Sequence, residues 1–181
     1  KRVTTSDYAS ANYYYVNKSS LPKVYGGFNT SLSWKGFDLS AIFAYSIGGY
    51  IYNRDITMIL HNGSLEGRDW STEILKRWTP ENRYTDVPAL STTSNNWNSA
   101  STRFLQNNSY MRLKNLTLSY DLPKQWISKL ALSSVQVFVQ GDNLFTIHRN
   151  QGLDPEQGIT GITYYRYPAM RTISGGINLS F

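Results

Sequence analysis

The side chains whose types could support chemistry are two histidines, His61 and His148, and two carboxylates, Asp154 and Glu156. Histidines could bind zinc, and paired carboxylates could act as general acid and base or hold calcium. Neither histidine has the spacing of a zinc motif, and the carboxylates flank Pro155, where a proline-directed turn is the simpler interpretation. We therefore expect solvated histidines, a loop turn, no catalytic residue and no metal site.

The composition argues against several other classes of site. The chain has no cysteine, so it offers no disulfide, thiol nucleophile or Cys-bound metal. Its net charge is +6, but the 18 Lys and Arg residues are scattered rather than clustered, which argues against a nucleic-acid surface. We expect neither a cofactor nor a nucleic-acid partner.

Aromatic residues are abundant, with 14 Tyr, 7 Phe and 5 Trp. Their flat, amphipathic rings can stack on sugars, pack against a partner protein or settle at membrane interfaces. Those in the long loops are the candidates for contact with a ligand or with a protein that covers the loops. They are Trp70, Trp78, Trp97, Tyr50, Tyr52, Tyr164 and Tyr165.

The elements that must position these residues are strands with alternating apolar and polar side chains, and the last stretch, 171–181, shows the pattern most clearly. One face is apolar and the other polar, and the chain ends on an aromatic residue. Such a strand is typical of a transmembrane barrel, where lipid covers the outer face and the lumen is wet. The residues of a predicted barrel-insertion signal are Ile173, Ile177, Leu179 and Phe181.

The same alternation predicts an all-β fold with strands near 24–34, 37–47, 109–120, 133–147 and 171–181. Each has about the length that a tilted transmembrane strand needs. A slip of phase between Leu113 and Leu116 indicates either a β-bulge or an upper half of the strand that lies outside the membrane. Lys35 with Gly36 predicts a tight turn. Mean hydropathy is −0.42 and no apolar run is long enough for a membrane helix.

The connections alternate between long and short. The long ones, 1–22, 48–108 and 148–170, are predicted to be extracellular loops, and the short ones periplasmic turns, as in outer-membrane barrels. This direction places the carboxy-terminus in the periplasm. Within 48–108 we expect one short helix at 70–78, with Ile74, Leu75 and Trp78 on one side.

Five strands are too few to close a barrel, because single-chain bacterial barrels have at least about eight. An open edge in hydrocarbon would leave backbone groups unpaired at several kcal/mol each. The 181 residues are therefore expected to be the carboxy-terminal part of a larger barrel domain, or one piece of a multi-chain barrel.

Six segments, in order along nearly the whole chain, carry a resemblance to a known family. They are LPKVYGGFNTSLSWKGFDL at 21–39, RWTPEN at 77–82, SYMRLKNLTLSYDLP at 109–123, GDNLF at 141–145, GLDPE at 152–156 and YPAMR at 167–171. The chain resembles the carboxy-terminal end of SusC/RagA-type TonB-dependent receptors of the outer membrane. That resemblance implies a 22-stranded barrel with an amino-terminal plug, powered by TonB and covered by a SusD-like lipoprotein.

The expected function is TonB-dependent import of oligosaccharides or peptides by an integral protein of the outer membrane. The resemblance implies as partners a SusD-like surface lipoprotein, the TonB complex through a plug outside this chain, further barrel strands, membrane lipid and the glycan or peptide ligand. Two alternatives stay open: a soluble carbohydrate-binding β-sandwich, and a small outer-membrane barrel enzyme. The second would need a Ser/His/Asp-like set, which the sequence does not suggest.

Overall fold

The computed structural model describes residues 7–61, 63, 65, 67–91, 96–128, 132–150, 152, 154–156 and 160–181. The chain divides into two compact units. The first consists of Lys1–Ser20, Ile51–Gln106 and Ile159–Arg166, and the second of Leu21–Tyr50, Asn107–Gly158 and Tyr167–Phe181.

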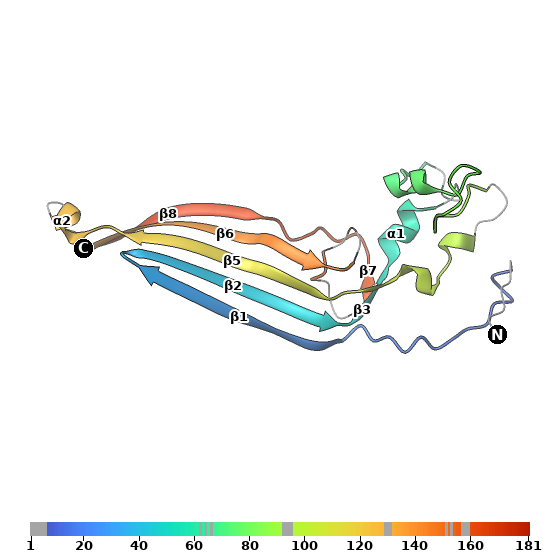
Figure 1. Cartoon of the computed structure of the whole chain (residues 1–181), viewed down its shortest axis with the longest axis horizontal. Coiled ribbons are helices and arrows are strands. Elements are labelled where there is room, and N and C mark those ends of the chain that lie inside the picture. Colours follow the sequence, from blue (N-terminus) through green and yellow to red (C-terminus); the bar gives the residue numbers. More distant parts are fainter. Residues whose placement is uncertain are drawn as a thin grey trace. The chain divides into compact units, whose positions relative to one another are not determined.

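The second unit is built on one antiparallel sheet of five strands, in the order β1-β2-β5-β6-β8 (Figure 1). The strands are β1 (Pro22–Trp34), β2 (Phe37–Gly48), β5 (Tyr110–Asp121), β6 (Ser134–His148) and β8 (Thr172–Ser180). This sheet confirms the predicted all-β fold. Neighbours in the sheet follow each other along the chain, apart from the short strands of the first unit, as in an up-and-down barrel wall.

Short connections join these strands at one end of the sheet. Lys35 and Gly36 both have positive φ, 48° and 87°, as a two-residue type I′ hairpin turn requires. Helix α2 (Lys124–Ile127) lies in the connection from β5 to β6. The carboxy-terminus lies at the same end as α2 (Figure 1), so the sheet has the asymmetry of connections that the sequence predicts.

The register puts most of the apolar side chains of the five strands on one face. Phe28 of β1 is opposite Phe43 of β2, and their rings stack at 4.7 Å. Leu39 is opposite Leu118, and the rows continue through β6 to β8. Many of these side chains are exposed in this chain: Val24, Phe28, Leu32, Trp34, Phe37, Leu39, Ile47, Leu118, Val137, Val139, Phe145, Ile147, Ile173, Ile177 and Leu179. We call this surface the apolar face.

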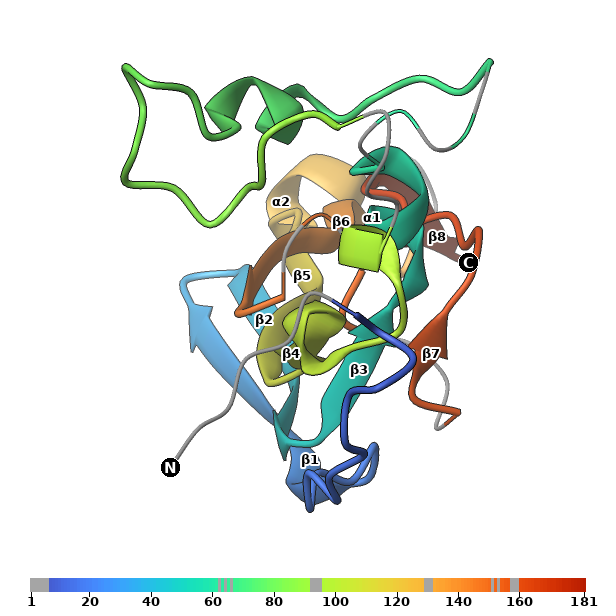
Figure 2. The ribbon, with the colours of Figure 1, turned by 90° about the vertical axis from the view of Figure 1, so that its right-hand side faces the viewer.

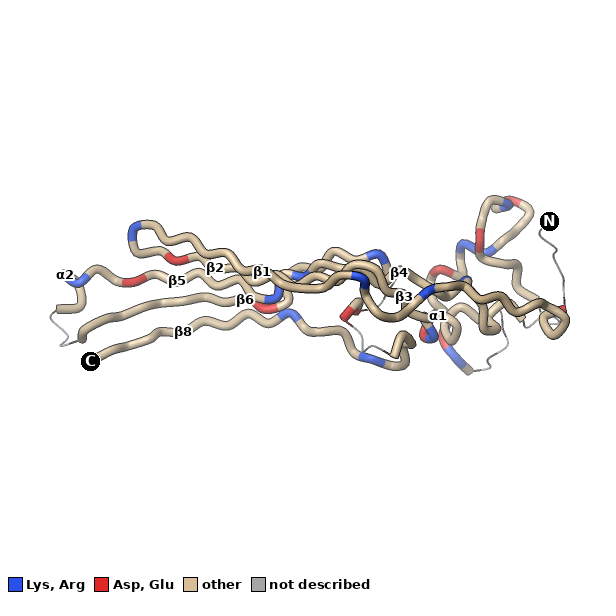
Figure 3. The backbone as a smooth tube through the Cα atoms, turned by 90° about the horizontal axis from the view of Figure 1, so that it is seen from below, with Lys and Arg blue, Asp and Glu red and all other residues tan. Residues whose placement is uncertain are grey.

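The opposite surface, the polar face, carries mostly hydroxyl, amide and small side chains. A hydrogen-bonded series there joins Thr117, Asn115, Asp142 and Gln140, with distances of 2.8–3.2 Å. Few charged residues occur along β1, β2, β6 and β8 (Figure 3). A sheet with this division of faces can meet lipid on one side and water on the other.

A β-bulge lies in the middle of β5, as predicted. The pairing with β2 shifts between Ile42 and Phe43, because Lys114 is an extra residue in β5. The shift brings Leu113 onto the same face as Leu116, with Phe43 as its partner. The bulge therefore keeps the apolar face continuous over the full length of β5.

The first unit contains more regular structure than the sequence predicts for 48–108. Strands β3 (Tyr50–Asn53), β4 (Leu105–Asn107) and β7 (Ile162–Thr163) form a small sheet in which β3 and β7 lie side by side (Figure 2). Helix α1 (Arg54–Ile59) follows β3 directly, and the Asn53 side chain caps it by accepting from the Ile56 N–H at 3.1 Å.

The helix expected at 70–78 is a shorter 3₁₀ helix, η1 (Thr72–Lys76), capped by Ser71. Its predicted apolar side is wrong, since Ile74 is buried but Leu75 is 72% exposed. A 3₁₀ helix has three residues per turn, so side chains that would share a face of an α-helix separate. Two further 3₁₀ helices are η2 (Asn96–Asn98) and η3 (Thr102–Phe104).

None of the helices in the described part of the chain is long and apolar enough to cross a membrane.

Candidate functional site

A buried arginine on the polar face organises the candidate site. Arg112 lies in β5, between Ala44 of β2 and Thr146 of β6, and its side chain is only 4% exposed. Its Nε donates a hydrogen bond to Thr146 Oγ1 at 3.0 Å. A buried guanidinium needs further partners to compensate for lost hydration.

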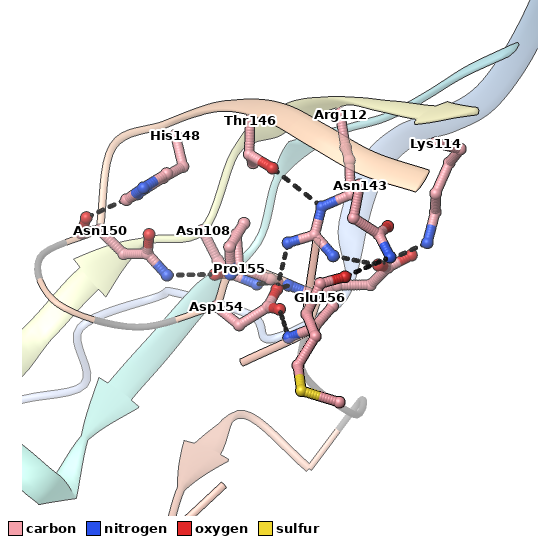
Figure 4. Close-up of polar contacts among 12 residues, drawn as sticks. Asn108, Arg112, Lys114, Asn143, Thr146, His148, Asn150, Asp154, Pro155 and Glu156 are labelled. Atoms are coloured by element: carbon pink, nitrogen blue, oxygen red, sulfur yellow. Dashed lines mark hydrogen bonds and ion pairs between the residues drawn. The ribbon is translucent and has the colours of Figure 1, made fainter. Parts of the chain in front are cut away.

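Those partners come from the loop between β6 and β8 (Figure 4). Arg112 Nη2 donates to Asp154 Oδ1 at 2.5 Å, and Nη1 donates to Glu156 Oε2 at 2.7 Å. Lys114, the bulge residue, also contacts Glu156 Oε2, at 2.6 Å. Two cations and two carboxylates thus form a balanced cluster, which we call the Arg112 network.

Asp154 is the most heavily bonded member of the network. Besides Arg112, it accepts the backbone N–H groups of Glu156 at 2.9 Å and Ala169 at 2.6 Å. Burial by itself would raise the pKa of the Asp154 carboxyl, but these N–H donors together with Arg112 hold that pKa below its usual value of 3.8. Asp154 is therefore ionised at neutral pH.

Neighbouring hydrogen bonds hold both arms of the loop against the sheet (Figure 4). Asn108 donates to the Pro155 carbonyl at 2.8 Å and accepts from Asn150 at 3.1 Å. On the other arm, Asn143 donates to the Met170 carbonyl at 3.2 Å. The two arms of the loop therefore lie on the polar face.

The sequence analysis missed this network. It interpreted Asp154 and Glu156 as a plain turn, whereas both form ion pairs across 42 or 44 residues of chain. The one signal available was Arg112 itself, an arginine in the middle of a predicted membrane strand, which must pair with a carboxylate or face water. Among the residues that the structure describes, no group of three or more acidic or histidine side chains could hold a metal ion.

The histidines differ from the expectation in one case. His61 is 2% exposed, so its predicted solvation is wrong. Its Nδ1 accepts hydrogen bonds from Trp70 Nε1 at 3.1 Å and from the Gly63 backbone N–H at 3.3 Å. His148 is exposed, and its Nδ1 lies 2.9 Å from the Asn150 carbonyl.

The aromatic candidates do not gather into one site. Tyr164 and Tyr165 form an exposed pair with ring centroids 4.5 Å apart, and Arg54 stacks on Tyr164 at 4.7 Å. Arg68 donates to the Tyr165 hydroxyl at 3.1 Å. The remaining five are separate: Trp70 and Trp78 are partly exposed, and Trp97, Tyr50 and Tyr52 are half-buried.

The residues of the predicted insertion signal lie on β8 or just after it. Ile173, Ile177 and Leu179 are on the apolar face, opposite Gly141, Val137 and Val135 of β6. Phe181 follows the strand and is 92% exposed. Their placement suits contact with lipid, and their role in insertion stays a prediction.

These observations define a class of protein. The sheet exposes one apolar face, bears charge and hydrogen-bonding groups on the other, and has β1 and β8 each paired on one side only in the described structure. Such a sheet is a section of the wall of an outer-membrane β-barrel, which further strands must complete.

Comparison with known proteins identifies the kind of barrel. No family model matches the chain. TonB-dependent receptor P3 of Formosa agariphila is 33% identical over 166 residues, covering 86% of this chain and 16% of the receptor. TonB-dependent receptor SusC of Bacteroides thetaiotaomicron is 27% identical over 168 residues, covering 92% of this chain and 16% of SusC. The chain thus spans about one sixth of the length of these relatives.

Solved structures agree. The RagAB peptide importer in its "closed-closed" state matches 99% of this chain and 19% of that chain, with a TM-score of 0.84 and 36% identity. The "open-open" state of the same importer matches with a TM-score of 0.82 and 35% identity. The chain is a segment of a SusC/RagA-like TonB-dependent receptor, a family of outer-membrane proteins.

Proposed function

We propose that the protein to which this segment belongs imports oligosaccharides or peptides across the outer membrane, powered by TonB. The observation that carries this proposal is the five-stranded sheet with its apolar and polar faces, in a chain that the RagAB peptide importer matches over 99% of its length. The segment contributes wall and loops, so its part in import is non-covalent. Its relatives are receptors and transporters rather than enzymes.

The partners follow from the same proposal. A SusD-like surface lipoprotein covers the loops, and the TonB complex acts through a plug that this segment does not include. Further strands of the same barrel pair with β1 and β8, and lipid covers the apolar face. The kinship with SusC and RagA supports the lipoprotein partner.

The orientation places Phe181 in the periplasm and the long loops outside the cell. It is supported by the short connections, which lie at the same end of the sheet as the carboxy-terminus (Figure 1). An epitope tag after Phe181 and a second tag at Tyr84, which is fully exposed, test this directly. Antibody should reach only the Tyr84 tag in intact cells, and the opposite pattern would reverse the orientation.

Ligand or lipoprotein contact by the loop aromatics also belongs to this proposal. Tyr164 and Tyr165 are the favoured pair, because their exposed rings are held in place by Arg54 and Arg68 and can stack on a ligand at little entropic cost. Replacing both by alanine in the full-length receptor should weaken binding of the lipoprotein or ligand. Leu75→Ala, at a more exposed apolar position of the same unit, serves as the control.

The import activity is tested in the source bacterium with the gene deleted and then restored. Growth on one oligosaccharide or peptide mixture should depend on the receptor, and the receptor should fractionate with the outer membrane and need detergent for extraction. Growth that is unchanged on every oligomer tested would contradict the import role. Recovery in a soluble fraction without detergent would instead favour the β-sandwich alternative, and hydrolysis of the oligomer by purified receptor would favour the enzyme.

A further inference from the structure

The loop between β6 and β8 raises the question of whether it moves during import. Extracellular loops that act as lids come from the weakly held parts of a protein, with few buried contacts. This loop is held differently. It meets the polar face, which is the lumen side of the wall, through residues of both its arms (Figure 4).

Burial is the first reason to regard the contact as permanent. Arg112 and Asp154 are 4% and 7% exposed, so water has little access to replace either partner of the ion pair. Lifting the loop would leave the Arg112 guanidinium on the wall with Thr146 as its remaining neighbour. Removal of one partner from a buried ion pair is strongly unfavourable.

The number of separate attachments is the second reason. The first arm is held at Asn150, Pro155 and Glu156, and the second at Ala169 and Met170. Asp154 also joins the two arms, because one of its oxygens accepts from Arg112 and the other from the Ala169 N–H. Movement of the loop would have to break all of these contacts together.

We infer that the two arms of the β6–β8 loop, at Asn150, 154–156 and 169–170, form a fixed lip on the lumen wall, held by the Arg112 network, and that this lip narrows the import passage without opening or closing. Arg112 and Asp154 are positioning residues, since they act through the loop. Glu156 of the lip and Lys114 of the wall, each about one-third exposed at 34%, are the charged groups at this contact that passing solute meets. The narrowing of the passage depends on the proposed import function, whereas the attachment of the lip to the wall does not.

The test joins the lip to the wall covalently in the full-length receptor, in its own outer membrane. Lys114→Cys with Glu156→Cys keeps the Arg112–Asp154 pair, and a short bismaleimide then replaces the ion pair between the two positions. This chain has no natural cysteine, and the two single-cysteine variants treated in the same way are the matched controls. Should the double variant fail to assemble, Asn108→Cys with Asn150→Cys joins the first arm instead.

For a fixed lip, cross-linking yield should change by less than about twofold between energised cells and cells treated with a protonophore, because no second state exists for TonB to favour. The cross-linked receptor should also take up a fluorescein-labelled tryptic digest of casein as well as the controls do. A severalfold lower yield in energised cells, or uptake lost only in the cross-linked receptor, would overturn the inference. If no variant takes up this probe, the peptide form of the proposed function fails, while the yields still decide whether the lip is fixed.

Discussion

Arg112 Nη2 and Asp154 Oδ1 lie 2.5 Å apart, and both side chains are less than one-tenth exposed. One residue belongs to a strand of the barrel wall and the other to the loop before the last strand. Their pairing is therefore a tertiary contact that ties a loop to the wall, and the Arg112 network is built around it.

Asp154→Asn should destabilise the full-length receptor by on the order of 3 kcal/mol, because it leaves the buried Arg112 charge without its main partner. Calorimetry of the purified receptor should show a lower transition temperature. The control is Glu73→Gln, which breaks an exposed pair with Lys76 that contributes only about 0.3 kcal/mol. Equal effects of the two changes would show that the Arg112–Asp154 pair contributes no more than a surface pair.

The hold on the loop should depend on pH through Asp154. Because the folded pKa of this carboxyl is depressed, its stabilising contribution is fully present above the usual value of 3.8 and is lost as pH falls through the lower folded pKa. Hydrogen exchange, corrected for the intrinsic rate at each pH, should show the Ala169 N–H protected down to about pH 4 and less protected below it. In Asp154→Asn this acid-dependent loss of protection should disappear. If the loss of protection is unchanged, a group other than Asp154 causes it.

Gly176 should resist enlargement because the Phe138 ring lies over it. A Cβ at Gly176 would come within 2.8 Å of that ring. Gly176→Ala should therefore reduce stability by about 1 kcal/mol, the lower end of the overpacking range, because the half-buried Phe138 ring can shift. Phe138→Ala removes the obstructing ring, so the double variant should lose less than the sum of the two single changes. Strict additivity in calorimetry would mean that the two side chains do not meet.

A charge should be tolerated on one face of the sheet and not on the other. Leu118→Arg puts a cation on the apolar face and should cost about 2–4 kcal/mol, depending on its depth in the bilayer. Ser40→Arg is the matched control, since Ser40 lies on the polar face beside Leu39, the partner of Leu118. The assembled receptor in outer membranes, measured by its heat-modifiable band, should fall mainly for Leu118→Arg. A greater loss for Ser40→Arg would mean that the polar face, and not the apolar face, meets lipid.

The strands and their faces could be predicted from the sequence because a barrel wall is periodic. Alternation alone assigns Val137 and Ile177 to one surface and Gln136 and Asn178 to the other, and the pairing of β6 with β8 agrees. Even the bulge was visible, since Leu113 and Leu116 are out of phase in the chain and share a face in the fold.

The first unit and the Arg112 network could not be predicted in the same way. The parallel pairing of β3 with β7 involves two residue pairs, Tyr52 with Ile162 and Asn53 with Thr163, which is too short to produce a pattern. The contact of Arg112 with Asp154 depends on how a loop folds back, and no local period encodes that. The burial of His61, whose ring contacts Trp70, likewise follows no sequence pattern, because a single histidine in a loop has no period.

The extra residue at Lys114 constrains how the length of β5 can change in evolution. Loss of Lys114 alone would make β5 regular against β2, because Asn115 and Leu113, the partners of Ile42 and Phe43, would become neighbours in the chain. Met111 and Leu113 would stay on the apolar face, and Arg112 on the polar face. A single deletion within a regular half of the strand would instead move the side chains beyond it to the opposite face. Related receptors are thus expected to vary in length at this position more readily than elsewhere in β5.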